Sequence, residues 1–287
     1  FNGKLHVTNN VPPEMTAYAR ERGGDDFCQD DYYVTIFYRL NTSRAPLNDA
    51  RVRRALSLAV DREALVRDVV CGGGQPCFRF SPGESTRDGA GYKTPHGVEF
   101  NPEKARSLLA QAGFPGGKGF PRLELMTTSR EVQKTMAEAI QGMWKKHLGI
   151  HVDIRSCEWT AYKFAQNSMQ YDFSSSSWSG DYLDPSSFLD LWGSASGNNN
   201  TGWFHPEYER LLAESRATGD QEKRMALLAR AEALMLSESP VIPLYWAKRS
   251  YLKRPEVRGW HPLLLDNHLF EDISLDDARE HGKEAAP

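Results

Sequence analysis

YDFSSSSWSGDYLDPSSFLDLW, residues 171–192, is the stretch that decides the fold class of this chain. A run of apolar residues and serines, typical of a strand, is followed by Asp181, by the turn residues DPSS and by the helical pattern SFLDLW. A carboxylate directly after a strand can pair with a ligand ammonium, and Trp178 beside it offers a flat apolar wall with one N–H donor. An Asp-capped turn without any role in binding explains the same residues.

The chain on both sides of this stretch alternates between strand and helix patterns. We predict strands over residues 4–8, 32–40, 122–127, 150–156, 171–178, 241–246 and 247–253. We predict helices over residues 12–22, 49–70, 101–112, 130–148, 159–168, 185–193, 205–216 and 220–237, with a Gly- and Pro-rich loop at 71–97. Such alternation predicts an α/β layer structure.

Composition and charge narrow the class of protein. The 287 residues are 40% hydrophobic and 25% charged, which is typical of an ordered globular chain. The apolar run PVIPLYW at 240–246 is much shorter than the roughly 18 residues needed to cross a bilayer, so we expect no membrane insertion of this segment. The net charge is -3, and Lys and Arg are scattered opposite Asp and Glu. This distribution argues against nucleic acid as a partner.

Four cysteines are present, and two of them lie close together in the sequence. Cys71 and Cys77 bracket CGGGQPC, where glycines and a proline let the chain fold back, so we predict a disulfide between them. A pairing of Cys28 with Cys157 stays open. Either bridge would place the protein in an oxidising compartment. A zinc site is disfavoured because neither isolated cysteine has a neighbouring His or Cys ligand, and we expect no metal and no cofactor.

No motif for catalysis is found in the sequence. It contains no G-x-S-x-G, no P-loop, no H-E-x-x-H and no G-x-G-x-x-G that opens a helix after a strand. The eight histidines are dispersed, and no spacing selects one of them as a general base. We therefore expect that the protein is not an enzyme and has no catalytic residues.

Two blocks carry a family resemblance, LNDARVRRALSLAVDRE at 47–63 and DYLDP at 181–185. In order with NPEKARSLLAQAGFPGG at 101–117, they resemble the C-terminal half of the bacterial extracellular solute-binding proteins of the oligopeptide, dipeptide and nickel type (family 5), the receptors of ABC importers. The resemblance covers roughly residues 2–275. It implies an α/β lobe of the periplasmic-binding-protein type II, a mixed sheet flanked by helices, together with strands and a helix that belong to the other lobe.

The same resemblance implies a division of the chain. Residues 1–30 are expected to belong to the first lobe, 31–250 to form the second ligand-binding lobe, and 251–287 to return to the first lobe and end in a tail. We expect the chain to be a C-terminal half of such a receptor. Its implied function is the capture of peptides or a related small solute for uptake, with ABC permease membrane subunits as partners. The implied location is periplasmic or extracytoplasmic, with lipid anchoring of the full-length protein as a further expectation.

Ligand-binding residues are implied by the resemblance as well. Asp181 matches an acid that pairs with the α-amino group of a peptide, and the backbone of Ser177, Trp178 and Ser179 would offer a strand edge for β-augmentation. Trp159 matches a tryptophan near the side-chain pockets, although a buried core position is an equal alternative. Asn199 and Asn200 either approach the ligand or bend their loop.

Other ligands and one other class of protein stay open. Peptide receptors of this kind often carry basic side chains around the ligand carboxylate, but the strand here reads SSSSW and Thr127–Gln133 contains no His, so the preferred peptide length stays open. A neutral or cationic solute, a nickel chelate, or a sugar bound by the hydroxyl groups of Ser174–Ser177 is then an alternative. The second class is a metabolite-sensing domain of a transcription regulator, which a helix-turn-helix in the full-length product would identify.

Overall fold

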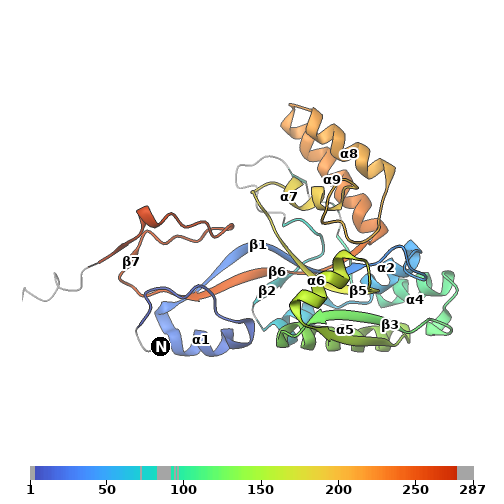
Figure 1. Ribbon diagram of the computed structural model, residues 1–287, viewed down its shortest axis with the longest axis horizontal. Helices are drawn as coiled ribbons and strands as arrows, with labels where there is room; N and C mark the ends of the chain where they lie inside the picture. Colours follow the sequence, from blue (N-terminus) through green and yellow to red (C-terminus); the bar gives the residue numbers. More distant parts are fainter. Residues whose placement is uncertain (1–3, 72, 83–91, 94, 96, 277–287) are drawn as a thin grey trace, which may run out of the picture.

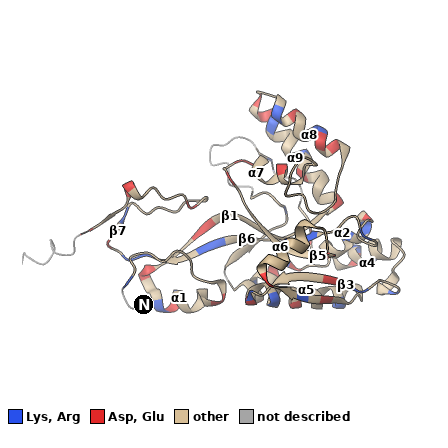
Figure 2. Ribbon diagram, in the orientation of Figure 1, with Lys and Arg blue, Asp and Glu red and all other residues tan. Residues whose placement is uncertain are grey.

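Two long antiparallel strands, β1 (Phe27–Leu40) and β6 (Val241–Leu252), form the frame of the molecule (Figure 1). The computed structural model describes residues 4–71, 73–82, 92–93, 95 and 97–276. Both strands begin or end in a large α/β body and extend out of it toward a smaller part that contains both ends of the described chain (Figure 1). In this connecting stretch Asp31 on β1 lies 3.7 Å from Lys248 on β6, and Figure 2 shows acidic residues on one strand beside basic residues on the other.

The body is built on a mixed six-stranded sheet in the order β2-β6-β1-β5-β3-β4. The remaining strands are β2 (Gly74–Pro76), β3 (Leu123–Thr128), β4 (Val152–Cys157) and β5 (Phe173–Ser179). β3 pairs in parallel with β4 and with β5, whereas β1 pairs antiparallel with β5 and β6. The predicted mixed sheet is therefore confirmed.

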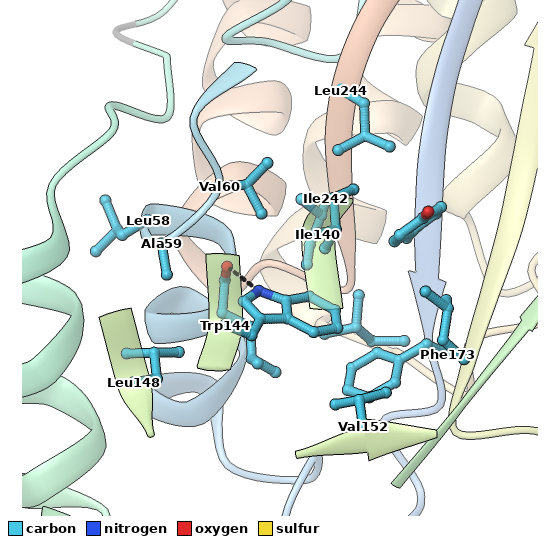
Figure 3. Close-up of a cluster of buried hydrophobic side chains, with 14 of the residues drawn as sticks. Leu58, Ala59, Val60, Ile140, Trp144, Leu148, Val152, Phe173, Ile242 and Leu244 are labelled. Atoms are coloured by element: carbon cyan, nitrogen blue, oxygen red, sulfur yellow. Dashed lines mark hydrogen bonds between the residues drawn. The ribbon is translucent and has the colours of Figure 1, made fainter. Parts of the chain in front are cut away.

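One face of the sheet carries the largest apolar cluster. Helices α2 (Ala50–Leu58), α4 (Pro102–Gln111) and α5 (Glu131–Leu148) cover it. Figure 3 shows Trp144 of α5 among side chains from the sheet, with its indole Nε1 donating to the Leu56 carbonyl oxygen at 2.9 Å. Trp144 is fully buried, and truncation of a buried Trp costs about 3–5 kcal/mol, so this side chain is a main anchor of the body.

The opposite face carries a second cluster. Phe37 and Tyr38 are neighbours in β1 but enter different clusters, because successive side chains of a strand point to opposite faces. Over Phe37 lie α7 (Ser186–Leu189), a 3₁₀ turn (Asp190–Trp192), α8 (Pro206–Ala217) and α9 (Gln221–Glu238). Helix α6 (Trp159–Asn167) packs beside β3 and β5 and contributes Tyr162 to a third, small cluster.

The smaller part holds the first and last described segments. It contains the 3₁₀ turn Pro13–Met15, α1 (Thr16–Gly23), the 3₁₀ turns Gly24–Asp26 and Phe270–Asp272, and the short strands β7 (Val257–Arg258) and β8 (Ser274–Leu275). The strand predicted at 4–8 is reduced to a single bridge between Val7 and Lys253. Across the described ranges, no helix has the length and apolarity that a membrane span requires.

The predicted helix 49–70 is the main error in secondary structure. It is broken into α2, α3 (Arg62–Leu65) and a π-helical turn (Val66–Val70). Asp61 starts the second helix because its carboxylate accepts a hydrogen bond from the Ala64 N–H at 2.9 Å. The buried Arg62 guanidinium donates hydrogen bonds to the carbonyl oxygens of Ser57 and Val60. These bonds occupy the carbonyl groups at the end of the first helix. The strands predicted at 241–246 and 247–253 are, conversely, one strand.

Candidate functional site

Strand β5 leaves part of one edge open. All seven of its residues pair with β1, from Val34↔Ser179 to Leu40↔Phe173. On its other side β3 pairs only with Phe173 and Ser174. Within the described chain, Ser175–Ser179 therefore have no strand partner on the side away from β1, and this side of residues 175–179 is named the open edge below.

The direction of the backbone groups along the open edge follows from strand geometry. The Gly180 N–H donates to the Tyr33 carbonyl oxygen at 2.9 Å, so Gly180 points toward β1. Since backbone polar groups alternate in direction along a strand, Ser177 and Ser179 point to the open side. The carbonyl oxygen of Ser175 also points there, and it is already bonded by the Tyr162 hydroxyl. Two exposed serines thus present unpaired N–H and C=O groups to a ligand.

Asp181 lies at the far end of the open edge with an exposed carboxylate. Its own N–H donates to Ser187 Oγ at 2.7 Å, and no described residue pairs with its side chain. The preceding Gly180 passes so close to the Tyr33 ring that a Cβ there would lie 2.3 Å from a ring carbon. The chain can therefore make this approach, and present Asp181, only with glycine at 180.

Asp184, three residues later, is held inside the structure. It accepts hydrogen bonds from the Ser186 N–H at 2.9 Å and from both terminal nitrogens of Arg224 at 2.7 and 2.8 Å. Burial raises the pKa of Asp184, but the bonds from Arg224 and Ser186 outweigh it and hold that pKa below its ordinary value. The two acids of the DYLD segment therefore differ, since Asp184 fixes the start of α7, whereas the Asp181 carboxylate has no partner among the described residues.

Trp178 was predicted to contact a ligand, but in the structure its side chain contacts the protein itself. Its Nε1 donates to the Ser187 carbonyl oxygen at 2.7 Å, so the N–H that we expected to face a ligand is used inside the protein. Its half-buried ring packs against the second apolar cluster. Ser187 Oγ also accepts a hydrogen bond from the Asp181 N–H. The two bonds to Ser187 connect the ends of the turn between β5 and α7, and they hold Asp181 in place.

Trp159 begins α6 and is 61% exposed, so the alternative of a buried core position is wrong. Its ring stacks on Tyr162, with ring centroids 5.9 Å apart, and the Lys163 ammonium lies 5.8 Å from the ring centre. An exposed aromatic face beside the start of the open edge is suited to an apolar side chain of a ligand.

The two predicted asparagines hold their loop. Asn199 Nδ2 donates to the carbonyl oxygens of Trp192 at 2.9 Å and Trp203 at 3.0 Å, and its Oδ1 accepts from Thr201 Oγ1 at 2.7 Å. Asn200 Nδ2 donates to the side chain of Asn167 on α6 at 3.1 Å. These bonds favour the loop-bending alternative for both residues.

Sequence reasoning missed a basic cluster at the start of the open edge. Arg39 of β1 is 4% exposed; its Nε donates to Ser176 Oγ at 2.9 Å and its Nη1 to the Asn198 carbonyl oxygen at 2.7 Å. Gln166 of α6 donates to the same Ser176 Oγ at 3.0 Å and accepts from the Lys163 ammonium at 3.1 Å. Strand β5 itself has no basic residue, and β1 and α6 bring Arg39 and Lys163 close to it.

No acid among the described residues neutralises the charges of this cluster. No ion pair joins Arg39 or Lys163 to an Asp or Glu of the described residues. Burial lowers the pKa of Arg39. Burial and then the charge of Arg39 lower the pKa of Lys163. Two cations thus lie near one another in a region partly shielded from water, where a bound anion would relieve their repulsion.

The predicted Cys71–Cys77 disulfide is not formed, and all four cysteines are free. Cys71 is exposed at the end of the π-helical turn, with a φ of 52°. Cys77 is buried, and the extended strand β2 between them advances the chain by about 3.3 Å per residue. Burial raises the pKa of the Cys77 thiol above its ordinary value, so the thiol is neutral and packs as an apolar group.

Among the described residues no three His, Cys, Asp or Glu side chains gather as metal ligands would.

Comparison with known proteins places this geometry in a context. Residues 1–200 match the family described as bacterial extracellular solute-binding proteins, family 5 Middle. The periplasmic oligopeptide-binding protein OppA of Salmonella typhimurium is 31% identical over 264 residues, which are 90% of this chain and 48% of that protein. The chain spans about half the length of the curated relatives it matches.

Solved structures show the same arrangement. A periplasmic oligopeptide-binding protein of Borrelia burgdorferi superposes with a TM-score of 0.84 at 33% identity, over 96% of this chain and 55% of that one. Haemophilus influenzae OppA, solved in complex with the peptide RPPGFSPFR, superposes with a TM-score of 0.83 at 25% identity, over 95% of this chain and 54% of that one.

Proposed function

Because this chain belongs to the bacterial extracellular solute-binding proteins of family 5, we propose that it is the C-terminal half of the substrate-binding component of an ABC importer that captures peptides. The observation that carries the proposal is the open edge of β5 with Asp181 at its end. Main-chain bonds to an edge hold a peptide of any sequence, and an unpaired carboxylate at one end selects a free amino group.

The division into lobes belongs to the same proposal. Residues 1–30 and 251–287 would belong to one lobe and residues 31–250 to the other. The course of β1 and β6, which leave the body and reach the smaller part, supports this division (Figure 1). A ligand held between two lobes would draw them together through contacts made only when they are closed.

The partners and location follow as parts of the proposal. The closed receptor would present its peptide to the permease subunits of an importer outside the cytoplasm, and the full-length protein would be kept near the membrane by a lipid anchor. Its role is binding and delivery without chemistry on the peptide. The periplasmic relatives support this assignment.

Substitution of Asp181 in the full-length receptor tests the proposal. Asp181→Asn should weaken binding of penta-alanine by about 1.5–3 kcal/mol, because a charge-assisted hydrogen bond to the α-amino group is lost. N-acetylated penta-alanine should bind weakly to both forms. Isothermal calorimetry measures the difference, and Glu138→Gln, a change at an exposed acid of α5, is the matched control. Equal affinities of wild type and Asp181→Asn would refute the role of Asp181.

A further inference from the structure

Glu232 of α9 is a carboxylic acid inside the body of the molecule. Its side chain is completely buried, and none of the ion pairs within the described chain includes it. Its Oε1 accepts hydrogen bonds from the Phe80 N–H at 2.8 Å and the Ser81 N–H at 2.6 Å, and its Oε2 accepts one from the Tyr92 hydroxyl. Three donors thus compensate part of the cost of burying this group, in the place that a cation would otherwise take.

These bonds hold residues 79–82, which we name the anchored segment. Both backbone groups of Phe80 are bonded, because its N–H donates to Glu232 and its carbonyl oxygen accepts from Thr35 Oγ1 at 2.8 Å. The Phe80 ring meets the Phe188 ring of α7 edge-on, with ring centroids 5.9 Å apart. Glu232 therefore fixes a segment that contacts β1 on one side and α7 on the other.

Thr35 and Phe188 connect the anchored segment to the candidate site. Thr35 lies opposite Trp178 in the pairing of β1 with β5. Phe188 directly follows Ser187, whose hydroxyl accepts the hydrogen bond of the Asp181 N–H. A movement of the anchored segment would thus act on the strand beside the open edge and on the turn that presents Asp181.

The stability of this arrangement depends on the protonation of Glu232. Burial raises the pKa of the Glu232 carboxyl, and the three hydrogen bonds that it accepts cancel only part of this rise. A carboxyl released into water has its ordinary pKa of 4.5. The anchored arrangement is therefore fully favoured below pH 4.5, and this advantage is lost as the pH rises through the raised pKa.

Other titratable or charged groups surround Glu232 from the neighbouring elements. Arg79 of the anchored segment opposes the rise in its pKa, and an arginine keeps its charge throughout the neutral and acidic range. Burial first, and the charge of Glu232 in addition, raises the pKa values of Cys77, of Tyr208 on α8 and of Tyr92. These three groups stay neutral up to pH 8. Among these five groups, Glu232 is therefore the one whose charge changes.

Resting on the proposed function, we propose that Glu232 is a positioning residue for ligand capture. A protonated Glu232 keeps the anchored segment in place and Asp181 in its binding position. Ionisation of Glu232 favours release of the segment and weakens the binding of the peptide's amino group. A ligand that needs the anchored state binds with an apparent affinity reduced by the fraction of molecules that have left that state. Through Glu232, peptide capture is coupled to the uptake of a proton.

The test compares wild type with Glu232→Gln in the full-length receptor between about pH 4.5 and about pH 8. Glutamine keeps an oxygen for the Phe80 and Ser81 N–H groups and an amide donor for Tyr92, so it imitates the protonated acid at every pH. The Kd of penta-alanine amide for wild type, divided by that for Glu232→Gln, should be near one at about pH 4.5 and rise about threefold or more by about pH 8. Calorimetry measures both values. Titration of Asp181 and of the peptide cancels in this ratio, because both proteins and both measurements share them.

Hydrogen exchange tests the position of the anchored segment without any ligand. Peptides that cover residues 79–82 should exchange faster in wild type than in Glu232→Gln at about pH 8 and equally at about pH 4.5, because two of their amides bond to residue 232. Glu222→Gln, a change at an exposed acid in the first turn of α9, is the matched control and should behave as wild type.

A second variant changes the same carboxyl from the other side. Tyr92→Phe removes a donor that favours the ionised form of Glu232, so the Kd of this variant should rise more between about pH 4.5 and about pH 8 than that of wild type. If Glu232→Gln does not fold, this comparison decides the question, and an equal or smaller rise would contradict the proposal.

The outcomes separate this inference from the proposed function. A ratio of wild type to Glu232→Gln that stays constant with pH, while the peptide still binds, would overturn the role of Glu232 alone. Loss of peptide binding by wild type at every pH would overturn the proposed function. The exchange of residues 79–82 would then still decide whether Glu232 controls the anchored segment.

Discussion

Two buried arginines of this protein lie in contrasting surroundings. Arg62, at the junction of α2 and α3, donates to the carbonyl oxygens of Pro243, Ser57 and Val60 at 2.7–3.2 Å, and to Ser57 Oγ at 3.0 Å. Arg39, at the start of the open edge, has two described acceptors, and one of its terminal nitrogens has no acceptor among the described residues. A buried cation whose three nitrogens all donate to groups of the protein holds the fold together. One whose donors are left over is available to a ligand.

Among substitutions that test this difference between the two arginines, Arg62→Ala is expected to have the largest effect on stability. Three backbone carbonyls would each lose the hydrogen bond that Arg62 donates inside the body, at about 1–3 kcal/mol for each group left unsatisfied, so the free energy of unfolding should fall by about 3–5 kcal/mol. Urea denaturation of the purified protein measures it. A loss below about 1 kcal/mol would show that water or a rearranged backbone replaces the guanidinium.

The two acids of the DYLD segment extend the comparison to carboxylates. Asp184→Asn should lower the free energy of unfolding by about 2 kcal/mol, because the bonds from Arg224 and Ser186 to a charged group are weakened. Asp181→Asn should change it by less than about 0.5 kcal/mol, since Asp181 has no described partner. Equal losses in the two variants would break the distinction between a structural and a free acid.

Acidification tests the same contrast. The pKa of Asp184 is lower in the folded protein than in the unfolded chain, so its contribution is complete above the unfolded pKa and is lost as the pH falls through the folded pKa. The stability difference between wild type and Asp184→Asn should therefore stay constant above about pH 5 and shrink as the pH falls below the ordinary pKa of an Asp, about 3.9, as measured by urea midpoints.

A small effect is also expected from Arg39→Met. Removing a buried charge that has no described ionic partner removes its desolvation cost, which offsets the hydrogen bonds lost to Ser176 and Asn198, so the free energy of unfolding should change by less than about 1 kcal/mol in either direction. Thermal unfolding without ligand measures this change. A loss as large as that of Arg62→Ala would mean that Arg39 is held by the fold as firmly as Arg62, and the contrast between them would disappear.

Sequence alone predicted most of the alternating strands and helices well, because each of them depends on a local periodicity of apolar residues. It placed α5 and α9 within about one residue of their ends. The helix predicted over 49–70 was wrong because Arg62 bonds to β6, which lies about 180 positions later in the chain.

For the candidate site too, some residues could be predicted from the sequence and others could not. Asp181 could be singled out because it directly follows a strand, but nothing in DYLD distinguishes it from Asp184, whose partner Arg224 is 40 positions away. Arg39 could not be identified at all. Within FYRL it resembles any residue of a strand, and its meaning depends on Ser176 of a neighbouring strand and on α6 above it.

The open edge has a consequence for how this protein behaves in concentrated solution. Unpaired N–H and C=O groups on a strand edge are a template for any other strand, including the same strand of another molecule. Here the accessible length is five residues, and its exposed positions are serines, which provide little apolar surface for a second molecule to cover. A short and hydrophilic edge can therefore bind a small ligand through its N–H and C=O groups. It still resists aggregation in which strands of other molecules extend the sheet.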